Sequence, residues 1–310
     1  MRLPSTLGHV LWVVVLGLST GGCSLSRVAA DTTASFLVEA APAARAYFDY
    51  ESAGLSAAAG IMQLEGLHKV SPNNEGLSLT LAQAYVVYAF GWVMDEREEA
   101  MFAGDYERAD YEQQRAFNMY KRAYELVFRI VCERDEEMAK LVSGDPELLT
   151  KRLREEWDDP EDDIELTFWW ALTWGSVVTN APSIDALVDF TAVKAVAAHV
   201  VFLDENYENA GALAMLGGYE SSYPEQIGGD WKKGREFFER AIKLSNRRNH
   251  LHLINFARTY AVNAQDKPLF VSLLNEVITS PDLGDDVRLS NKVARRRAQR
   301  YLKHIDQWFE

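Results

Sequence analysis

The sequence predicts an all-α protein in which degenerate helical hairpins stack into an α-solenoid. Two observations support this prediction: one spacing of small and aromatic residues recurs along the chain, and strand-type alternation is scarce. The length of 310 residues indicates either two domains or a stacked array, because a single core rarely grows beyond about 250–300 residues. We expect the array, as one α-helical domain over residues 35–310.

The recurring spacing is clearest in residues 229–244. Gly234, Phe238 and Ala241 stand at i, i+4 and i+7, so they share one face of a helix. Two small residues around an aromatic ring let a partner helix approach closely, and Asp230 is the expected N-cap. This is the second-helix half of a tetratricopeptide-like hairpin. The same spacing recurs at Ala116, Tyr120 and Ala123, and first-helix halves occur at residues 81–85 and 256–260.

The start of the chain resembles a bacterial lipoprotein signal. Residues 10–18 form a compact apolar run, which is typical of a signal peptide and too short to span a bilayer comfortably. Gly21 and Gly22 directly precede Cys23, and a cysteine in this position becomes the diacylated N-terminus of a mature lipoprotein. We therefore expect a signal peptide over residues 1–22 and lipidation at Cys23.

A short tether over residues 23–34 is expected to follow the acylated cysteine. The alternative is ordinary signal cleavage near Ala29 and Ala30, which would discard Cys23. Ser24 is not an acidic retention residue, which favours the outer membrane over the inner membrane as the site of anchoring.

Turn residues and apolar periodicity divide the body of the chain into helices. We expect these at residues 36–50, 52–70, 76–94, 142–153, 166–175, 184–202, 204–219, 229–244, 249–262, 267–279 and 285–309. The polar residues 95–112 are interpreted as an insertion that extends a helix ending near residue 134. The acidic run 155–165 is interpreted as a solvated loop, because its acids lack the glycine-punctuated spacing of a calcium loop.

The most unusual segment is residues 166–175, which holds three tryptophans and a phenylalanine. Trp170 and Trp174 share a helical face. Indole rings either fill a helical core or line a ligand cavity, where each N–H needs a partner, and the sequence leaves both interpretations open. The candidate ligand-binding or pore residues are Trp170, Trp174, Tyr219, Tyr223 and Tyr85.

Several classes of function find no support in the sequence. A formal net charge of −14 argues against binding of nucleic acid by the whole protein. No metal-ligand spacing, phosphate-binding glycine loop or nucleophile elbow is present, so we predict no catalytic residue, no metal and no cofactor. Cys132 is expected to be buried and inert. The basic helix near the C-terminus is interpreted as a polar cap on the array, with binding of anionic lipid or nucleic acid as the alternative.

Taken in order, these segments resemble the T-component family of tripartite ATP-independent periplasmic (TRAP) transporters. The resemblance covers nearly the whole mature chain. It rests on the lipoprotein-like start and on residues 81–85, 169–175, 228–241, 255–262 and 295–298. It implies a non-catalytic periplasmic lipoprotein that binds the solute-binding subunit of a TRAP transporter. It also implies a homotrimer and a hydrophobic pore through each protomer that passes an apolar ligand.

Two alternative functions stay open. The first is a scaffold lipoprotein that recruits envelope-assembly proteins through its concave face, and the second, less supported, is an envelope hydrolase with an unrecognised site. A closed cavity lined by Trp170, Trp174 and Tyr219 would favour the transporter accessory. The same rings buried in packing between helices, beside an open polar groove, would favour the scaffold.

Overall fold

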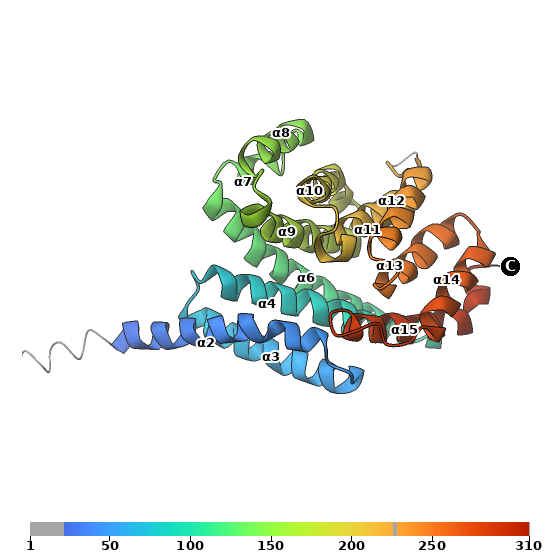
Figure 1. Ribbon diagram of the computed structural model, residues 1–310, viewed down its shortest axis with the longest axis horizontal. Helices are drawn as coiled ribbons and strands as arrows, with labels where there is room; N and C mark the ends of the chain where they lie inside the picture. Colours follow the sequence, from blue (N-terminus) through green and yellow to red (C-terminus); the bar gives the residue numbers. More distant parts are fainter. Residues whose placement is uncertain (1–21, 226–227, 310) are drawn as a thin grey trace, which may run out of the picture.

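The computed structural model describes residues 22–225 and 228–309, and within them it contains helices and no strand (Figure 1). The predicted all-α, solenoid-like fold is therefore confirmed. The N-terminal half comprises α2 (Gly22–Arg45), α3 (Tyr50–Val70), α4 (Glu75–Tyr88), the π-helix η1 (Ala89–Val93), α5 (Met94–Ala103), α6 (Tyr106–Arg134), α7 (Met138–Leu141) and α8 (Pro146–Glu156). The rest comprises α9 (Pro160–Asn180), η2 (Ile184–Asp189), α10 (Phe190–Leu203), α11 (Tyr207–Ser222), α12 (Trp231–Leu244), α13 (His250–Asn255), the π-helix η4 (Phe256–Ala261), α14 (Lys267–Thr279), α15 (Arg288–Lys303) and η5 (Ile305–Gln307).

Short polar side chains set where many of these helices begin. The carboxylate of Asp230 accepts a hydrogen bond from the Lys233 backbone N–H at 3.0 Å, which confirms the predicted N-cap of α12. Capping of this kind satisfies backbone donors that have no partner inside the helix. The other helices capped by an Asp, Asn or Ser side chain are α3, α4, α6, α8, α9, η2, α13 and α14.

Neighbouring helices pack in sequence along the array. Helix α6 lies against α4 and α9, α9 lies against α10, and α11 lies against α10 and α12 (Figure 1). Buried side chains form two clusters, one centred on α4, α6, α9 and α10 and the other on α12, α13, α14 and α15. This succession is what a repeat array requires, because each hairpin buries its apolar face against its neighbours.

The repeated spacing of small and aromatic residues marks the places where helices approach most closely. Phe238 is fully buried in α12, and a Cβ at Gly217 of α11 would lie 2.9 Å from its ring. A Cβ at Gly234 would overlap the Ser221 hydroxyl. Gly217 therefore makes room for the Phe238 ring, and Gly234 lets α12 approach Ser221 of α11.

The last helix returns to the first third of the chain, where α15 packs against α2 and α3 (Figure 1). Its arginines face carboxylates of α5: Arg296 Nε lies 2.6 Å from Asp95 Oδ2, and Arg300 Nη2 lies 2.5 Å from Asp95 Oδ1. Much of the basic charge predicted for this helix is therefore paired inside the protein, so the ends of the array are joined to each other.

Several segments differ from the prediction. The expected tether over residues 23–34 is helical and forms the first part of α2, in keeping with its alanine-rich composition. Residues 95–112 do not extend a single helix, because Gly104 adopts φ 77° and ends α5 before α6 begins. The acidic run 155–165 is not a loop throughout: α9 begins at Pro160, with Asp159 as its N-cap. The predicted helix at 142–153 begins later, at Pro146.

Candidate functional site

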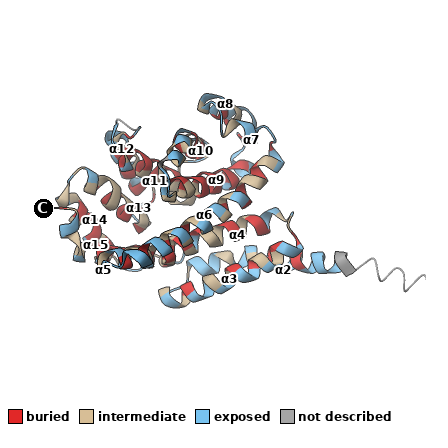
Figure 2. Ribbon diagram, turned by 180° about the vertical axis from the view of Figure 1, so that it is seen from behind, coloured by how far each residue is buried: buried red, intermediate tan, exposed pale blue. Residues whose placement is uncertain are grey.

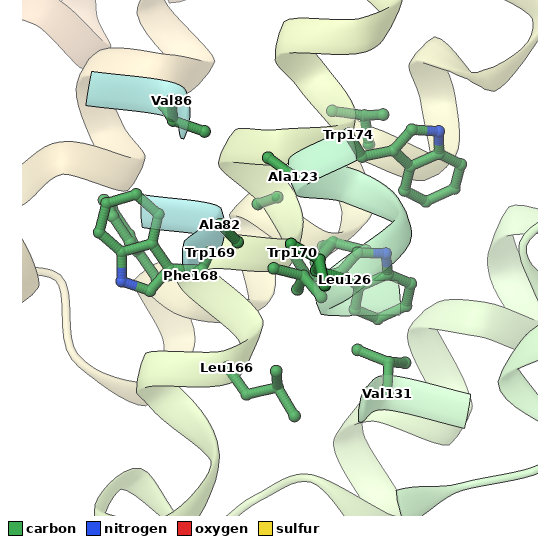
Figure 3. Close-up of a cluster of buried hydrophobic side chains, with 14 of the residues drawn as sticks. Ala82, Val86, Ala123, Leu126, Val131, Leu166, Phe168, Trp169, Trp170 and Trp174 are labelled. Atoms are coloured by element: carbon green, nitrogen blue, oxygen red, sulfur yellow. The ribbon is translucent and has the colours of Figure 1, made fainter. Parts of the chain in front are cut away.

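The two predicted tryptophans of α9 lie side by side with nearly parallel rings (Figure 3). The ring centroids of Trp170 and Trp174 are 5.9 Å apart, and the ring planes differ by 5°. Helix α6 contributes a second aromatic pair, in which Tyr124 lies 6.0 Å from Trp174 and Phe128 lies 6.1 Å from Trp170. Four stacked rings therefore fill the contact between α6 and α9. Offset stacking of this kind is a favourable arrangement for aromatic side chains.

The two indole N–H groups have different environments. Trp174 Nε1 lies 3.3 Å from a carboxylate oxygen of Asp189 and donates to it. Trp170 is fully buried, and its Nε1 finds no acceptor among the described residues. Burying such a donor without a partner costs about 1–3 kcal/mol. The Trp170 indole is therefore a fully buried donor in this stack that lacks a hydrogen bond within the described residues.

Phe168 and Trp169 project to the other side of α9 (Figure 3). The two rings meet edge to face at 5.5 Å, and Phe168 also contacts Tyr207 at 5.4 Å. A Cβ at Gly211 would lie 2.9 Å from the Phe168 ring, so this glycine lets α11 approach α9. Both faces of the tryptophan-rich segment are thus filled by side chains of neighbouring helices.

Tyr219 and Tyr223 pack around Phe190 on the adjoining part of the array. Their ring centroids lie 5.3 and 5.1 Å from that of Phe190. The Tyr219 hydroxyl points at α9, where a Cβ at Gly175 would lie only 1.7 Å from it. Burial raises the pKa of Tyr219. Tyr219 and Tyr223 therefore belong to the same large buried cluster as Trp174, but their ring contacts are with Phe190 and those of Trp174 are with Tyr124 and Trp170.

Tyr85 lies apart from the other four predicted residues. Its hydroxyl donates to Glu65 Oε1 at 3.0 Å, and Arg122 pairs with the same carboxylate at 2.9 Å. Burial, followed by the Glu65 hydrogen bond, raises the pKa of Tyr85 to about 12. Tyr85 belongs to a half-buried polar cluster on α3, α4 and α6 rather than to the tryptophan stack.

Two open surface pockets of the described residues lie away from the aromatic stack. One, of about 500 Å³, is lined by residues near the C-terminus that include Gln265, Lys267 and Trp308. The other, of about 350 Å³, is lined by polar residues that include Arg45, Glu208 and Arg248. The predicted tryptophans are therefore packed between helices, and neither pocket is lined by them.

Sequence reasoning missed a buried polar cluster, which joins η1 and α5 to α15. Asp95 is 2% exposed between Arg296 and Arg300. Arg297 is buried, lies 4.0 Å above the Phe90 ring and donates to the Phe90 carbonyl at 2.6 Å. The i, i+4 spacing of Arg296 and Arg300 was a usable signal, but nothing local indicates that its partner lies two hundred residues away.

The two cysteines and the possible metal ligands remain to be placed. The side chain of Cys23 and residues 1–21 lie outside the described part of the structure. Cys132 is half-buried rather than buried, and burial raises the pKa of its thiol. Among the described residues, no group of three or more His, Cys, Asp or Glu side chains is placed to hold a metal.

Two helical stretches, Glu75–Ala103 and Asp185–Leu203, have the length and apolar composition of a membrane span. Such stretches also occur as core helices of soluble proteins, and Leu77 and Leu81 in the first stretch are fully buried inside the protein. We therefore do not assign either stretch to a bilayer.

Comparison with known proteins agrees with the resemblance found in the sequence. The chain matches the family described as the TRAP transporter T-component over residues 48–309, which is most of its length. No curated protein matches the chain. The matched range runs from the start of α3 to the end of the array and includes both the aromatic stack and the ionic cluster. The chain therefore belongs to the TRAP transporter T-component family.

Proposed function

We propose that this protein is a periplasmic lipoprotein that binds the solute-binding subunit of a TRAP transporter. Membership of the T-component family carries the proposal, since it supports an accessory role in TRAP transport. The fold fits that role, because stacked hairpins offer an extended surface for another protein. No catalytic step is part of the proposal.

The proposed anchor is an acylated Cys23, which lies in the first turn of α2. At 1.5 Å per residue, the 24 residues of α2 span about 36 Å. A helix of that length would hold the body at a fixed orientation to the lipid surface more firmly than a flexible tether would. We propose the periplasmic face of the outer membrane as the location, because Ser24 is not an acidic retention residue.

The proposed ligand site is the aromatic core at Trp170, Trp174, Tyr219 and Tyr223, with Tyr85 at a separate position. The observation that supports it is the buried Trp170 N–H without an acceptor among the described residues. An apolar ligand with one acceptor group would satisfy that donor and rest against the stacked rings. Its entry requires α6 and α9 to separate, because the rings occupy the space between these helices.

The scaffold function is the second candidate, and one observation favours it. Trp170 and Trp174 are 0% and 3% exposed and pack between helices, which is the arrangement expected if the rings serve the core alone. In that case the protein recruits other proteins and binds no small molecule.

Co-purification from the native envelope distinguishes the two functions. The full acylated protein is captured, and co-purifying proteins and extracted small molecules are identified by mass spectrometry. Recovery of a TRAP solute-binding subunit supports the accessory function, whereas recovery of envelope-assembly proteins without that subunit supports the scaffold. Loss of a bound apolar molecule in a Trp170→Phe variant, which keeps a ring but removes the N–H, assigns the ligand to this stack.

A further inference from the structure

The first half of α2 carries an apolar stripe on the side that faces away from the body of the protein. Leu25, Val28 and Phe36 are 70%, 62% and 67% exposed, although a monomer rarely groups exposed apolar side chains in one place. With Thr32 they stand at i, i+3, i+7 and i+11, so the four residues share one face of the helix and form the α2 stripe. The N-terminal part of α2 is largely exposed (Figure 2).

Contacts on the inner side of α2 fix which way the stripe faces. Ala30 and Ala34 are buried against the body. Asp31 accepts hydrogen bonds from the Ser71 hydroxyl at 2.5 Å and from the Asn74 amide at 2.8 Å, both in the turn between α3 and α4. These contacts prevent α2 from rotating about its own axis, so the stripe is held toward the outside.

The last turn of α2 is also tied to the array. Arg45 forms a two-point ion pair with Glu208 at the start of α11, with distances of 3.0 and 2.8 Å. The helix packs against α3, α4 and α15 as well. Helix α2 therefore belongs to the body, and any surface that contacts the stripe also sets the orientation of the whole array.

The surface nearest to the stripe is the membrane, if Cys23 carries the proposed acyl chains. Leu25 and Val28 follow Cys23 by two and five residues, which places them only about 3 and 8 Å further along the helix axis. An apolar helix face beside a lipid anchor lies in the boundary between headgroups and acyl chains. We propose that residues 25–36 of α2 lie flat in this boundary, with the α2 stripe facing the lipid.

The length of the stripe determines this orientation. From Leu25 to Phe36 it extends about 17 Å along the helix axis, so an upright helix would leave most of it in water. Glu39 is exposed on the same side of the helix, three residues after Phe36, and its charge marks where the lipid contact ends. The proposal rests on the proposed acylation and deepens it: α2 faces the lipid, and α10 lies on the far side of the array, open to a periplasmic partner (Figure 1).

The charge of the chain decides which lipids the stripe can bind. Arg27 is the only basic residue between positions 23 and 44, and the chain has a formal net charge of −14. Attraction to anionic lipid requires clusters of basic residues, so burial of apolar side chains must drive the contact. The contact should therefore form on uncharged phosphatidylcholine and should not weaken when the salt concentration is raised.

Spin labels measure which side of α2 meets the lipid. Val28→Cys, Phe36→Cys and Thr33→Cys are labelled singly in the acylated full chain, in which Cys132→Ser removes the other thiol, and the protein is placed in phosphatidylcholine vesicles. Thr33 is exposed on a different side of the helix and serves as the control.

The labels at positions 28 and 36 should show an about tenfold higher ratio of collisions with dissolved oxygen to collisions with a water-soluble nickel complex than the label at 33, because they lie in lipid. Equal ratios at the three positions overturn the proposal. Equal shielding of the label at 36 in the protein without lipid also overturns it, because another protein surface then covers the stripe.

Vesicle binding without acyl chains separates the stripe from the anchor. In the mature chain with Cys23→Ser, Val28→Asp and Phe36→Asp should each lower binding to phosphatidylcholine vesicles about tenfold, because each removes one apolar side chain from the lipid. Val188→Asp is the matched control, since Val188 is 84% exposed and lies next to α10 on the far side of the array. All three positions are exposed, so the variants should fold, and circular dichroism checks this.

Unchanged binding in Phe36→Asp, or an equal loss in Val188→Asp, overturns the flat orientation of α2. The mass of the N-terminal peptide from the native protein reports acylation separately. An unmodified Cys23 would contradict the proposed anchor, whereas the vesicle measurement would still decide whether the stripe binds lipid.

Discussion

The carboxylate of Asp95 holds the two ends of the helical array together, so removing it should destabilise the whole fold. It is 2% exposed and accepts hydrogen bonds from Arg296 at 2.6 Å and Arg300 at 2.5 Å. Breaking a buried ion pair from one side costs about 3–5 kcal/mol, because the other charge stays buried without compensation. Arg300 keeps Glu98 at 2.6 Å as a second partner, so we expect Asp95→Ala to cost about 3 kcal/mol, the lower end of that range.

Thermal unfolding followed by circular dichroism measures this loss. A change of 1 kcal/mol moves the Tm of a chain of this size by about 1.5–2 °C, so Asp95→Ala should lower Tm by roughly 5–6 °C. Glu96→Ala is the matched control on the same helix. Glu96 pairs with Arg108 where both side chains are about half exposed, and such a surface pair contributes less than about 1 kcal/mol. Equal Tm values for the two variants would refute the idea that the buried cluster joins the ends of the array.

Three further predictions concern the buried core. Trp170→Ala should lower the free energy of unfolding in urea by about 3–5 kcal/mol, because Trp170 is fully buried in a stack of rings. Trp170→Phe should lower it by clearly less, since a ring remains in the stack. Equal losses in the two variants would contradict the packing described. Gly175→Ala should lower the free energy of unfolding by about 1–3 kcal/mol, because the added methyl group clashes with the Tyr219 hydroxyl. Tyr219→Phe in the same chain should recover part of that loss. If the losses of the two single variants simply add in the double variant, the clash is not the cause. His252 is buried, and burial lowers its pKa despite a 2.7 Å hydrogen bond to the Asn209 carbonyl. Its contribution to stability is therefore complete above its unfolded-state pKa of about 6.5 and is lost as pH falls through the lower folded-state pKa. The urea unfolding free energy measured between pH 5 and 8 should decline less steeply toward acid in His252→Gln, and an unchanged slope would count against this assignment.

The helical array followed from the sequence because its signal is local. Gly234, Phe238 and Ala241 are spaced for one helix face, and in the structure all three are buried in α12. The same holds for the second occurrence of the spacing in α6, where Ala116, Tyr120 and Ala123 are buried. The start of α9 was missed, because residues 155–165 were interpreted as a loop, although Asp159 as N-cap and Pro160 at the first helical position form a recognised start signal.

Features that join distant segments did not follow from the sequence. Asp95 and Arg300 become partners only because the array brings its last helix back to α5, and no local rule encodes that meeting. The turn at the start of α11, a local feature, was not predicted either. Glu208, Asn209 and Ala210 adopt φ values of 48°, 58° and 64°, although such left-handed backbone favours glycine.

The candidate aromatic residues include one feature that the sequence predicted and others that it did not. The i, i+4 spacing of Trp170 and Trp174 predicted their shared face, and the two rings are stacked. Tyr124 and Phe128 have the same spacing in α6 and pack against them, but this second pair was not singled out from the sequence. Tyr85 lies elsewhere because α4 points it toward Glu65 and Arg122.

Direct binding between this protein and the solute-binding subunit of a TRAP transporter from the same organism tests the central claim. The acylated full chain in detergent is titrated with the purified subunit in a calorimeter, and a periplasmic solute-binding protein of another transporter class serves as the control. We predict saturable binding to the TRAP subunit and none to the control. Absence of binding with the subunit both empty and loaded with solute would contradict the proposed function.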